Sequence, residues 1–222
     1  MAEVRHPLSH PRSVGVFVTE LVMISVAVFL GLLADQWRES RQFQAAGLAA
    51  LSRLQAEVLT NQKMVTAERD YHQRMLKDLT AFVNAARVFP YDTHPMAWKT
   101  PRPGDRKAFF DANPRLEGTH PIFFEHTAWD LAVVTQALAH IDPDLAYRIS
   151  RVYTQQALFQ TYEMNFVATI TTPASLADGM VAAYAESLWQ YFGDVDYQEK
   201  RLLEQYETLI PAVNQALAAG KP

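Results

Sequence analysis

The apolar stretch between residues 14 and 34 constrains this chain more than any other feature. It reads VGVFVTELVMISVAVFLGLLA and contains a single charged residue, Glu20. A bilayer core of about 30 Å requires about 20 apolar helical residues, so the stretch predicts a transmembrane helix. No second apolar run of this length follows in the sequence. We therefore expect a single-pass protein with a short N-terminal tail (residues 1–13) and a helical soluble domain (residues 35–222).

The flanks of this stretch favour an uncleaved anchor. Arg5 and Arg12 resemble the basic region of a secretion signal, but the apolar run exceeds the usual 7–15 residues and residues 32–34 form a poor cleavage site. Trp37 and Arg38 fit an aromatic and a basic anchor at the membrane interface. We expect the bacterial inner membrane, with the N-terminus inside and the large domain in the periplasm. The reverse orientation and a cleaved signal remain the alternatives.

One face of the predicted transmembrane helix is suited to contact with another helix. At 100° per residue, Glu20, Ala27, Gly31 and Ala34 fall on one stripe. A carboxylate inside a membrane usually faces protein, and the spacing of Ala27 and Gly31 allows close helix approach. We expect this stripe to pack against another membrane protein or a copy of this chain. The alternative is that small residues are common in such helices and Glu20 reaches the interface.

The pattern around the anchor resembles a known family. Glu20 opens the apolar run, the sequence DQWRE closes it at residues 35–39, and a long polar helix follows. Over residues 18–61, with a weaker similarity in TAWD at residues 127–130, the chain resembles a widespread bacterial family of uncharacterised small single-pass membrane proteins. The resemblance implies a membrane-anchored helical domain with its N-terminus inside. It implies no activity and no catalytic residues.

The composition of the soluble part excludes several classes of function. Residues 35–222 carry 18 Lys and Arg against 22 Asp and Glu, so phosphate-driven binding of nucleic acid is not expected. The chain has no cysteine, which excludes disulfides, thiol catalysis and cysteine metal sites.

The soluble part reads as helical throughout. Residues 35–88 contain no proline and one glycine, and their apolar residues recur near heptad spacing, which predicts one amphipathic helix or two helices divided around residues 66–74. Residues 124–141 predict a further helix. Asp142-Pro143 and Thr172-Pro173 predict helix starts, Gly193-Asp194 predicts a helix end, and Pro211 predicts a kink or an interruption. An all-α fold with an antiparallel helical bundle is the simplest architecture.

A proline-rich loop interrupts the helical pattern at residues 89–122. Loops of this length inside a compact domain are often functional. The loop contains Tyr91, Trp98, Phe109 and Phe110, and aromatic residues are common at protein interfaces. It is either an interaction surface or a loop folded over the bundle whose aromatic side chains cap the core.

Motifs of catalysis are missing from the sequence. There is no phosphate-binding glycine loop, no HExxH and no GxSxG. His120, Glu125 and His126 are the one local group that resembles metal ligands, but their spacing fits solvent-exposed loop residues better. Glu163 is expected on the solvent face of its helix. We therefore assign no catalytic residue, no metal ligand and no cofactor.

Three hypotheses of function remain. The first is a non-enzymatic accessory subunit that docks on a larger membrane complex, such as an energy-converting, light-harvesting, transport or envelope assembly. The second is a membrane-tethered sensory or ligand-binding bundle. The third is an enzyme with a site that the sequence does not reveal. Exposed aromatic patches would favour the first hypothesis, and a cavity between helices the second.

Overall fold

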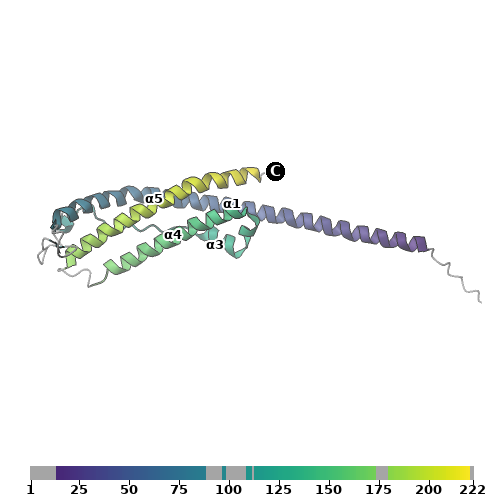
Figure 1. Ribbon diagram of the computed structural model, residues 1–222, viewed down its shortest axis with the longest axis horizontal. Helices are drawn as coiled ribbons and strands as arrows, with labels where there is room; N and C mark the ends of the chain where they lie inside the picture. Colours follow the sequence, from purple (N-terminus) through teal and green to yellow (C-terminus); the bar gives the residue numbers. More distant parts are fainter. Residues whose placement is uncertain (1–13, 89–96, 99–108, 112, 174–179, 221–222) are drawn as a thin grey trace, which may run out of the picture. The chain divides into compact units, whose positions relative to one another are not determined.

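The computed structural model describes residues 14–88, 97–98, 109–111, 113–173 and 180–220 (Figure 1). Its elements are α1 (Val14–Ala86), β1 (Arg87–Val88), β2 (Ala97–Trp98), α3 (Thr127–Val134), the 3₁₀ helix η1 (Ala137–His140), α4 (Pro143–Ile170) and α5 (Val181–Ala219). The strands β1 and β2 pair antiparallel, with Arg87 opposite Trp98. Apart from these two short strands, every regular element in the described residues is helical. The expected all-α class is therefore confirmed.

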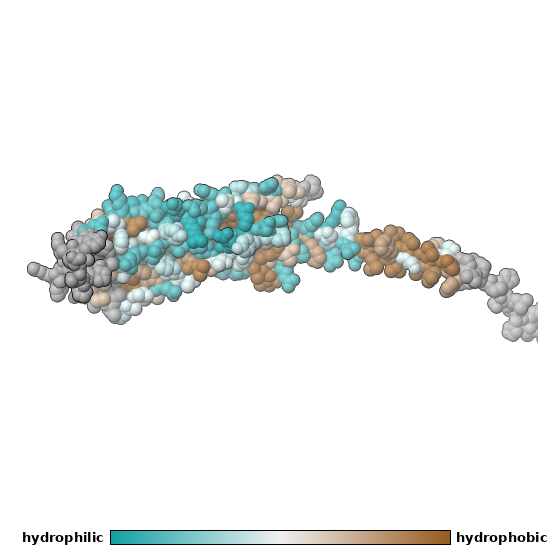
Figure 2. Space-filling view, viewed as in Figure 1, coloured by the Kyte–Doolittle hydropathy of each residue, from teal (hydrophilic) through white to brown (hydrophobic). Residues whose placement is uncertain are grey.

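The chain divides into two compact units, Met1–Ala46 and Gly47–Pro222, here called the N-terminal unit and the C-terminal unit. Among the described residues, one helix is long and apolar enough to cross a membrane, and it lies near the N-terminus. Its most apolar window has a mean hydropathy of 2.3, and none of that window is buried. The corresponding part of α1 forms a hydrophobic band in Figure 2. The expected single apolar helix is thus present.

In the C-terminal unit, α5 runs antiparallel to both of its neighbours (Figure 1). Against α1, Trp189 near the start of α5 donates to Thr80 at 2.9 Å. The end of α5 instead meets an earlier part of α1, where Gln55 is hydrogen-bonded to Asn214. Against α4, Arg148 near its start donates to Thr208 in the later part of α5, whereas Tyr162 further along α4 donates to Asp194 in the earlier part. Three packed helices therefore form the body of this unit.

The helices α1 and α4 run in the same direction, which differs from a wholly antiparallel bundle. The cause is the irregular segment at residues 116–126, here called the connecting segment, which returns along α1 before α4 begins. Near its start, Tyr71 donates to the carbonyl of Gly118 at 2.7 Å. Near its end, the main chain of Glu125 is bonded to Asn61, ten residues earlier in α1.

The core of the C-terminal unit follows the predicted heptad spacing in α1. Leu51, Leu54, Val58 and Val65 are buried, and the apolar positions that follow in α1 continue the same stripe. The largest fully buried aromatic side chains come from α4, α5 and the region before the connecting segment: Phe109, Phe159, Tyr191, Phe192 and Tyr206. α1 continues through residues 66–74, where the buried position is taken by His72, so it is one helix and not two.

Helix boundaries agree with the sequence at one start signal and differ elsewhere. Asp142 caps α4, because its side chain accepts the Leu145 N–H at 2.9 Å and Pro143 follows at the first helical position. The predicted start at Thr172-Pro173 leads into residues 174–179, which lie outside the described residues. By contrast, α5 (Val181–Ala219) continues through Gly193, where a helix end was expected. An interior glycine costs only about 1 kcal/mol relative to alanine, which tertiary packing readily offsets.

The predicted break at Pro211 is also not a helix end. α5 continues to Ala219 although proline removes one helical hydrogen bond. Leu209 and Val213 on either side are buried, so apolar packing holds this turn in place. The predicted helix at residues 124–141 is shorter than expected, because the chain turns at Gln136 in a left-handed conformation (φ 55°).

Candidate functional site

A buried carboxylate from α1 fixes the start of α3. Glu57 accepts the backbone N–H of Ala128 at 2.6 Å, that of Trp129 at 3.2 Å and the Tyr153 hydroxyl at 2.7 Å. His126, at the N-cap position of α3, makes no side-chain cap bond. Glu57 therefore supplies the acceptor that the first turn of α3 lacks locally, and it joins α1, α3 and α4.

Asn61 holds the connecting segment through its main chain. Its side-chain nitrogen donates to the carbonyl of Glu125 at 2.8 Å, and its oxygen accepts the N–H of the same residue at 2.9 Å. The side chain of Asn61 is fully buried, whereas Glu125 is exposed. The pair of bonds satisfies an irregular backbone that would otherwise lose its hydrogen bonds on burial.

His72 is buried between α5 and the connecting segment. Its Nδ1 lies 2.6 Å from the carboxylate of Glu199, and its Nε2 lies 3.1 Å from the carbonyl oxygens of Thr119 and His120. The two carbonyl oxygens can only accept, so Nε2 carries a proton and donates, and the hydrogen bond between Nδ1 and Glu199 ties the other side of the ring to α5. Burial by itself lowers the pKa of His72, but the hydrogen bond and charge of Glu199 outweigh it and raise the pKa.

Glu199 also faces a second basic side chain, that of Arg69, so its pair with His72 is part of a larger ion cluster. Arg69 lies 3.8 Å from the other carboxylate oxygen of Glu199 and 3.1 Å from Asp196. Glu199 is fully buried, whereas Arg69 and Asp196 are partly exposed. The cluster therefore ties α1 to α5 by one buried pair and one pair open to water.

Glu163 on α4 is fully buried, so the expectation that it faces solvent is wrong. It accepts the backbone N–H of Ile122 at 3.1 Å and the Tyr191 hydroxyl at 3.3 Å. Burial raises its pKa to about 7, and these hydrogen bonds and the charge of His72 offset only part of that effect. Burial therefore favours the protonated form of Glu163 more than that of an exposed glutamate.

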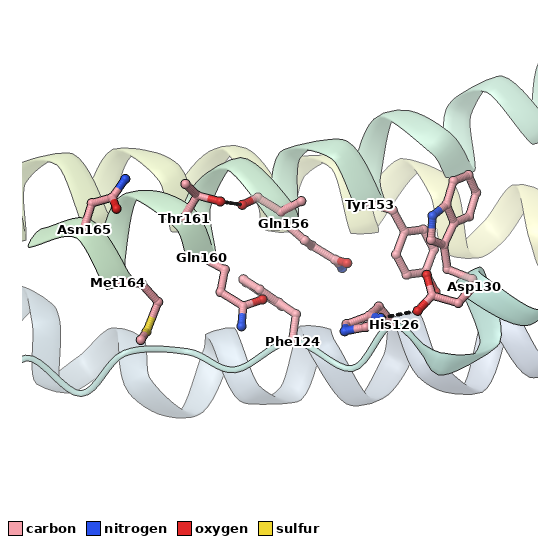
Figure 3. Close-up of a pocket in the computed structure, with 11 residues that line it drawn as sticks. Phe124, His126, Asp130, Tyr153, Gln156, Gln160, Thr161, Met164 and Asn165 are labelled. Atoms are coloured by element: carbon pink, nitrogen blue, oxygen red, sulfur yellow. Dashed lines mark hydrogen bonds and ion pairs between the residues drawn. The ribbon is translucent and has the colours of Figure 1, made fainter. Parts of the chain in front are cut away.

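A groove of about 550 Å³ lies between α4 and the chain that leads into α3 (Figure 3). Its floor holds the buried side chains of Phe124, Tyr153 and Gln156. Trp129 is half-buried and stacks on Tyr153, with ring centroids 4.8 Å apart. Exposed side chains form its rim: His126, Asp130, Thr161, Met164 and Asn165. Its size is within the range of small-molecule sites.

α3 presents an apolar surface to solvent. Of its eight residues only Ala132 is buried, although the helix is rich in apolar side chains. Leu131, Val133 and Val134 are 44%, 47% and 81% exposed. We call these three residues the α3 surface. Exposed apolar clusters of this kind are typical of contact sites.

The predicted stripe and interface anchors lie in the N-terminal unit. Described side chains at residues 17–46 are all exposed, including those of Glu20, Ala27 and Ala34, and a Cβ added at Gly31 would meet no atom within 4 Å. Trp37 is exposed, with the guanidinium of Arg41 4.0 Å from its ring centre, a cation–π contact.

The aromatic residues of the predicted loop lie in different environments in the structure. Tyr91 lies outside the described residues, as does most of the stretch 89–122. Trp98 belongs to β2. Phe109 is buried and packs edge-on against Phe82, so it belongs to the core and is not an interface anchor. Phe110 is half-buried against Phe109.

The three candidate metal ligands do not converge. His120 pairs with Glu68 at 3.1 Å, while His126 pairs with Asp130 at 2.6 Å. Within the described residues, no group of three or more such side chains is arranged to hold a metal ion. His72 and Glu163 do not line the groove, so the buried acids and bases serve packing in this geometry.

Sequence reasoning missed the buried polar residues, although a signal for them exists. In α1 the buried positions recur at three- and four-residue spacing, and Asn61 and His72 fall on that stripe. Gln156 and Glu163 fall on the equivalent stripe of α4, and Glu199 on that of α5. A polar residue at a core position of a heptad is thus the sequence signal for these contacts.

No family model, curated protein or solved structure matches this chain.

Proposed function

We propose that this chain is a non-enzymatic, membrane-anchored accessory subunit that docks on a larger membrane protein complex. The observation that carries the proposal is the α3 surface, where Leu131, Val133 and Val134 stay exposed beside a well-packed core. Such a surface is costly in water unless another protein covers it. Energy-converting, light-harvesting, transport and envelope assemblies are the candidate hosts.

The membrane anchor determines what kind of partner this surface meets. A domain tethered by one apolar helix samples other membrane proteins at high local concentration, so a modest docking surface is sufficient for stable association. In the membrane, the stripe of Glu20, Ala27, Gly31 and Ala34 would contact a helix of the same partner or of a second copy. We place the anchor in a bacterial inner membrane, with the C-terminal unit in the periplasm.

The buried polar contacts support a scaffold role more than catalysis. Four buried polar side chains form their hydrogen bonds with backbone atoms or with neighbouring helices: Glu57, Asn61, His72 and Glu163. Those groups hold α3 and the connecting segment at fixed positions on the bundle. A rigid base is what a docking surface needs, because ordering it on binding would cost affinity.

The test is purification of the tagged full-length chain from its native membrane in mild detergent, followed by mass determination and protein identification. We expect a stoichiometric complex that survives with Leu158→Lys and is lost with Val134→Lys. Leu158 is the matched control, because it is 62% exposed on α4, away from the α3 surface. Recovery as a monomer or homodimer, or an intact complex with Val134→Lys, would contradict the proposal.

A membrane-tethered ligand-binding bundle is the second candidate function. The groove on α4, with its aromatic floor, favours this alternative. Its test is native mass spectrometry of the same purified protein, in which a small molecule of constant mass should accompany the chain.

A further inference from the structure

The floor of the groove is built on aromatic side chains. Phe124 and Tyr153 are 6% and 4% exposed, and Trp129 stacks on Tyr153 from the side of α3. Stacked and edge-on ring contacts favour a planar aromatic ligand over a bulky aliphatic one. The volume of about 550 Å³ accommodates one such molecule with room for substituents.

The same floor contains one unsatisfied polar group. The nitrogen of Gln156 donates to the Tyr206 hydroxyl at 2.7 Å, but its Oε1 has no hydrogen-bond partner among the described residues. Gln156 is 2% exposed and its amide end extends into the groove region (Figure 3). A buried acceptor without a partner is destabilising, and a ligand with an N–H or O–H group directed at it would remove that penalty.

The charges around the groove select against anions. None of the described residues that line it is Lys or Arg, and the rim imidazole of His126 is engaged by Asp130 at 2.6 Å. A carboxylate or phosphate would therefore lose its hydration without gaining a cation. An uncharged molecule avoids this cost.

We propose that the groove between α4 and the start of α3 binds an uncharged, planar aromatic small molecule whose N–H donates to Oε1 of Gln156. The proposal rests on the ligand-binding role given above as the second candidate function. The oxygen is closed to water in this structure, so the proposal requires the side chains around it to move as the ligand enters. Gln160, one helical turn from Gln156 on α4, lines the same groove.

A matched pair of probes tests the hydrogen bond. 5-Fluoroindole is planar, uncharged and carries one N–H, and 5-fluoro-1-methylindole lacks that donor. Binding is measured by fluorine NMR line broadening with the full-length protein in nanodiscs, after subtraction of the broadening caused by empty nanodiscs. We expect saturable binding of 5-fluoroindole with a dissociation constant below about 1 mM. We expect the methylated probe to bind about tenfold more weakly.

Variants locate the site. Ala157→Trp fills the groove from an exposed position that lines it and should abolish binding, whereas Ala168→Trp, exposed on α4 outside the groove, should not. Gln156→Leu should make the two probes equal. Gln205→Leu is its control, because Gln205 also has a buried oxygen without a partner among the described residues but does not line the groove.

The outcomes separate the site from the function on which it rests. Binding that is absent, or unchanged in Ala157→Trp, overturns the groove as the site. Equal binding of both probes to the unmodified protein overturns the role of Gln156. If native mass spectrometry still finds a small molecule on Ala157→Trp, the ligand-binding function stands while the groove proposal fails.

Discussion

Replacing Glu57 by glutamine should release the start of α3 from the bundle. The carboxylate accepts three hydrogen bonds, from the N–H groups of Ala128 and Trp129 and from the hydroxyl of Tyr153. An amide of the same shape has one acceptor and one donor. In either orientation its NH₂ group faces at least one backbone N–H, which is then buried without a partner.

The size of the effect follows from the better of the two orientations. If the amide oxygen accepts from Ala128 and the nitrogen donates to Tyr153, only the N–H of Trp129 is left unsatisfied. That group costs about 1–3 kcal/mol, and the remaining bonds lose the strength that an ionised acceptor gives them. We expect Glu57→Gln to lower the free energy of unfolding by about 2–4 kcal/mol.

The measurement is urea unfolding of the full-length protein in detergent, followed by circular dichroism, together with amide hydrogen exchange at Ala128 and Trp129. Exchange at these two amides should accelerate even under native conditions, because the bonds that protect them are weakened. Tyr153→Phe is the comparison: it removes one donor, leaves both backbone bonds, and should cost about 1 kcal/mol.

The two substitutions should also be coupled. In a double-mutant cycle, Tyr153→Phe should cost less in the Glu57→Gln background than in the unmodified protein, because a neutral amide bonds the Tyr153 hydroxyl more weakly than the carboxylate does. An unchanged urea midpoint together with unchanged exchange at Ala128 and Trp129 would refute the assignment of Glu57 as the cap of α3.

Three further perturbations test other parts of the structure. Because burial raises the pKa of Glu163 to about 7 from 4.5, the folded chain holds its proton more firmly than the unfolded chain. The contribution of Glu163 to the free energy of unfolding should fall by about 3 kcal/mol as pH rises through that interval; Glu163→Gln should remove this part of the pH dependence in urea titrations, and an unchanged slope would contradict the account. Gly47→Ala should destabilise by about 1–3 kcal/mol in thermal melts, because its Cβ would lie 2.7 Å from a backbone oxygen of η1. Gly193→Ala, whose Cβ would lie 3.9 Å from the nearest side chain, should be neutral or stabilising by up to about 1 kcal/mol; equal losses for both would rule out the close approach. Leucine at both Ala27 and Gly31 should release the chain from its assembly during detergent purification, and an intact assembly at unchanged yield would exclude the stripe as a docking surface.

Local signals predicted the parts of the fold that local forces decide. The apolar stripe of α1 could be predicted from the sequence because Leu54, Val58 and Val65 repeat at helical spacing. The start of α4 was readable because Asp142 and Pro143 act within one turn of each other. Both depend on neighbours in the sequence, so no tertiary information was needed.

Tertiary contacts decide the features that the sequence did not reveal. Glu163 was expected at the surface because carboxylates usually lie there. It lies instead on the face of α4 that packs inward, where the Ile122 N–H and the Tyr191 hydroxyl donate to it. The helix end expected at Gly193 fails because α5 packs against α1 on both sides of it. The groove depends on how the chain before α3 lies against α4, which no local pattern encodes.

The contacts that hold the connecting segment have a consequence for how this protein can evolve. Glu57, Asn61 and His72 all bind main-chain atoms of residues 119–129, and none of these bonds depends on which side chains that stretch carries. Selection on these hydrogen bonds therefore falls on one partner only. We expect homologues to keep the three polar residues of α1 while the exposed positions of the stretch they hold, such as Phe123 and Glu125, diverge, so that the surface above it can acquire new specificities without loss of the fold.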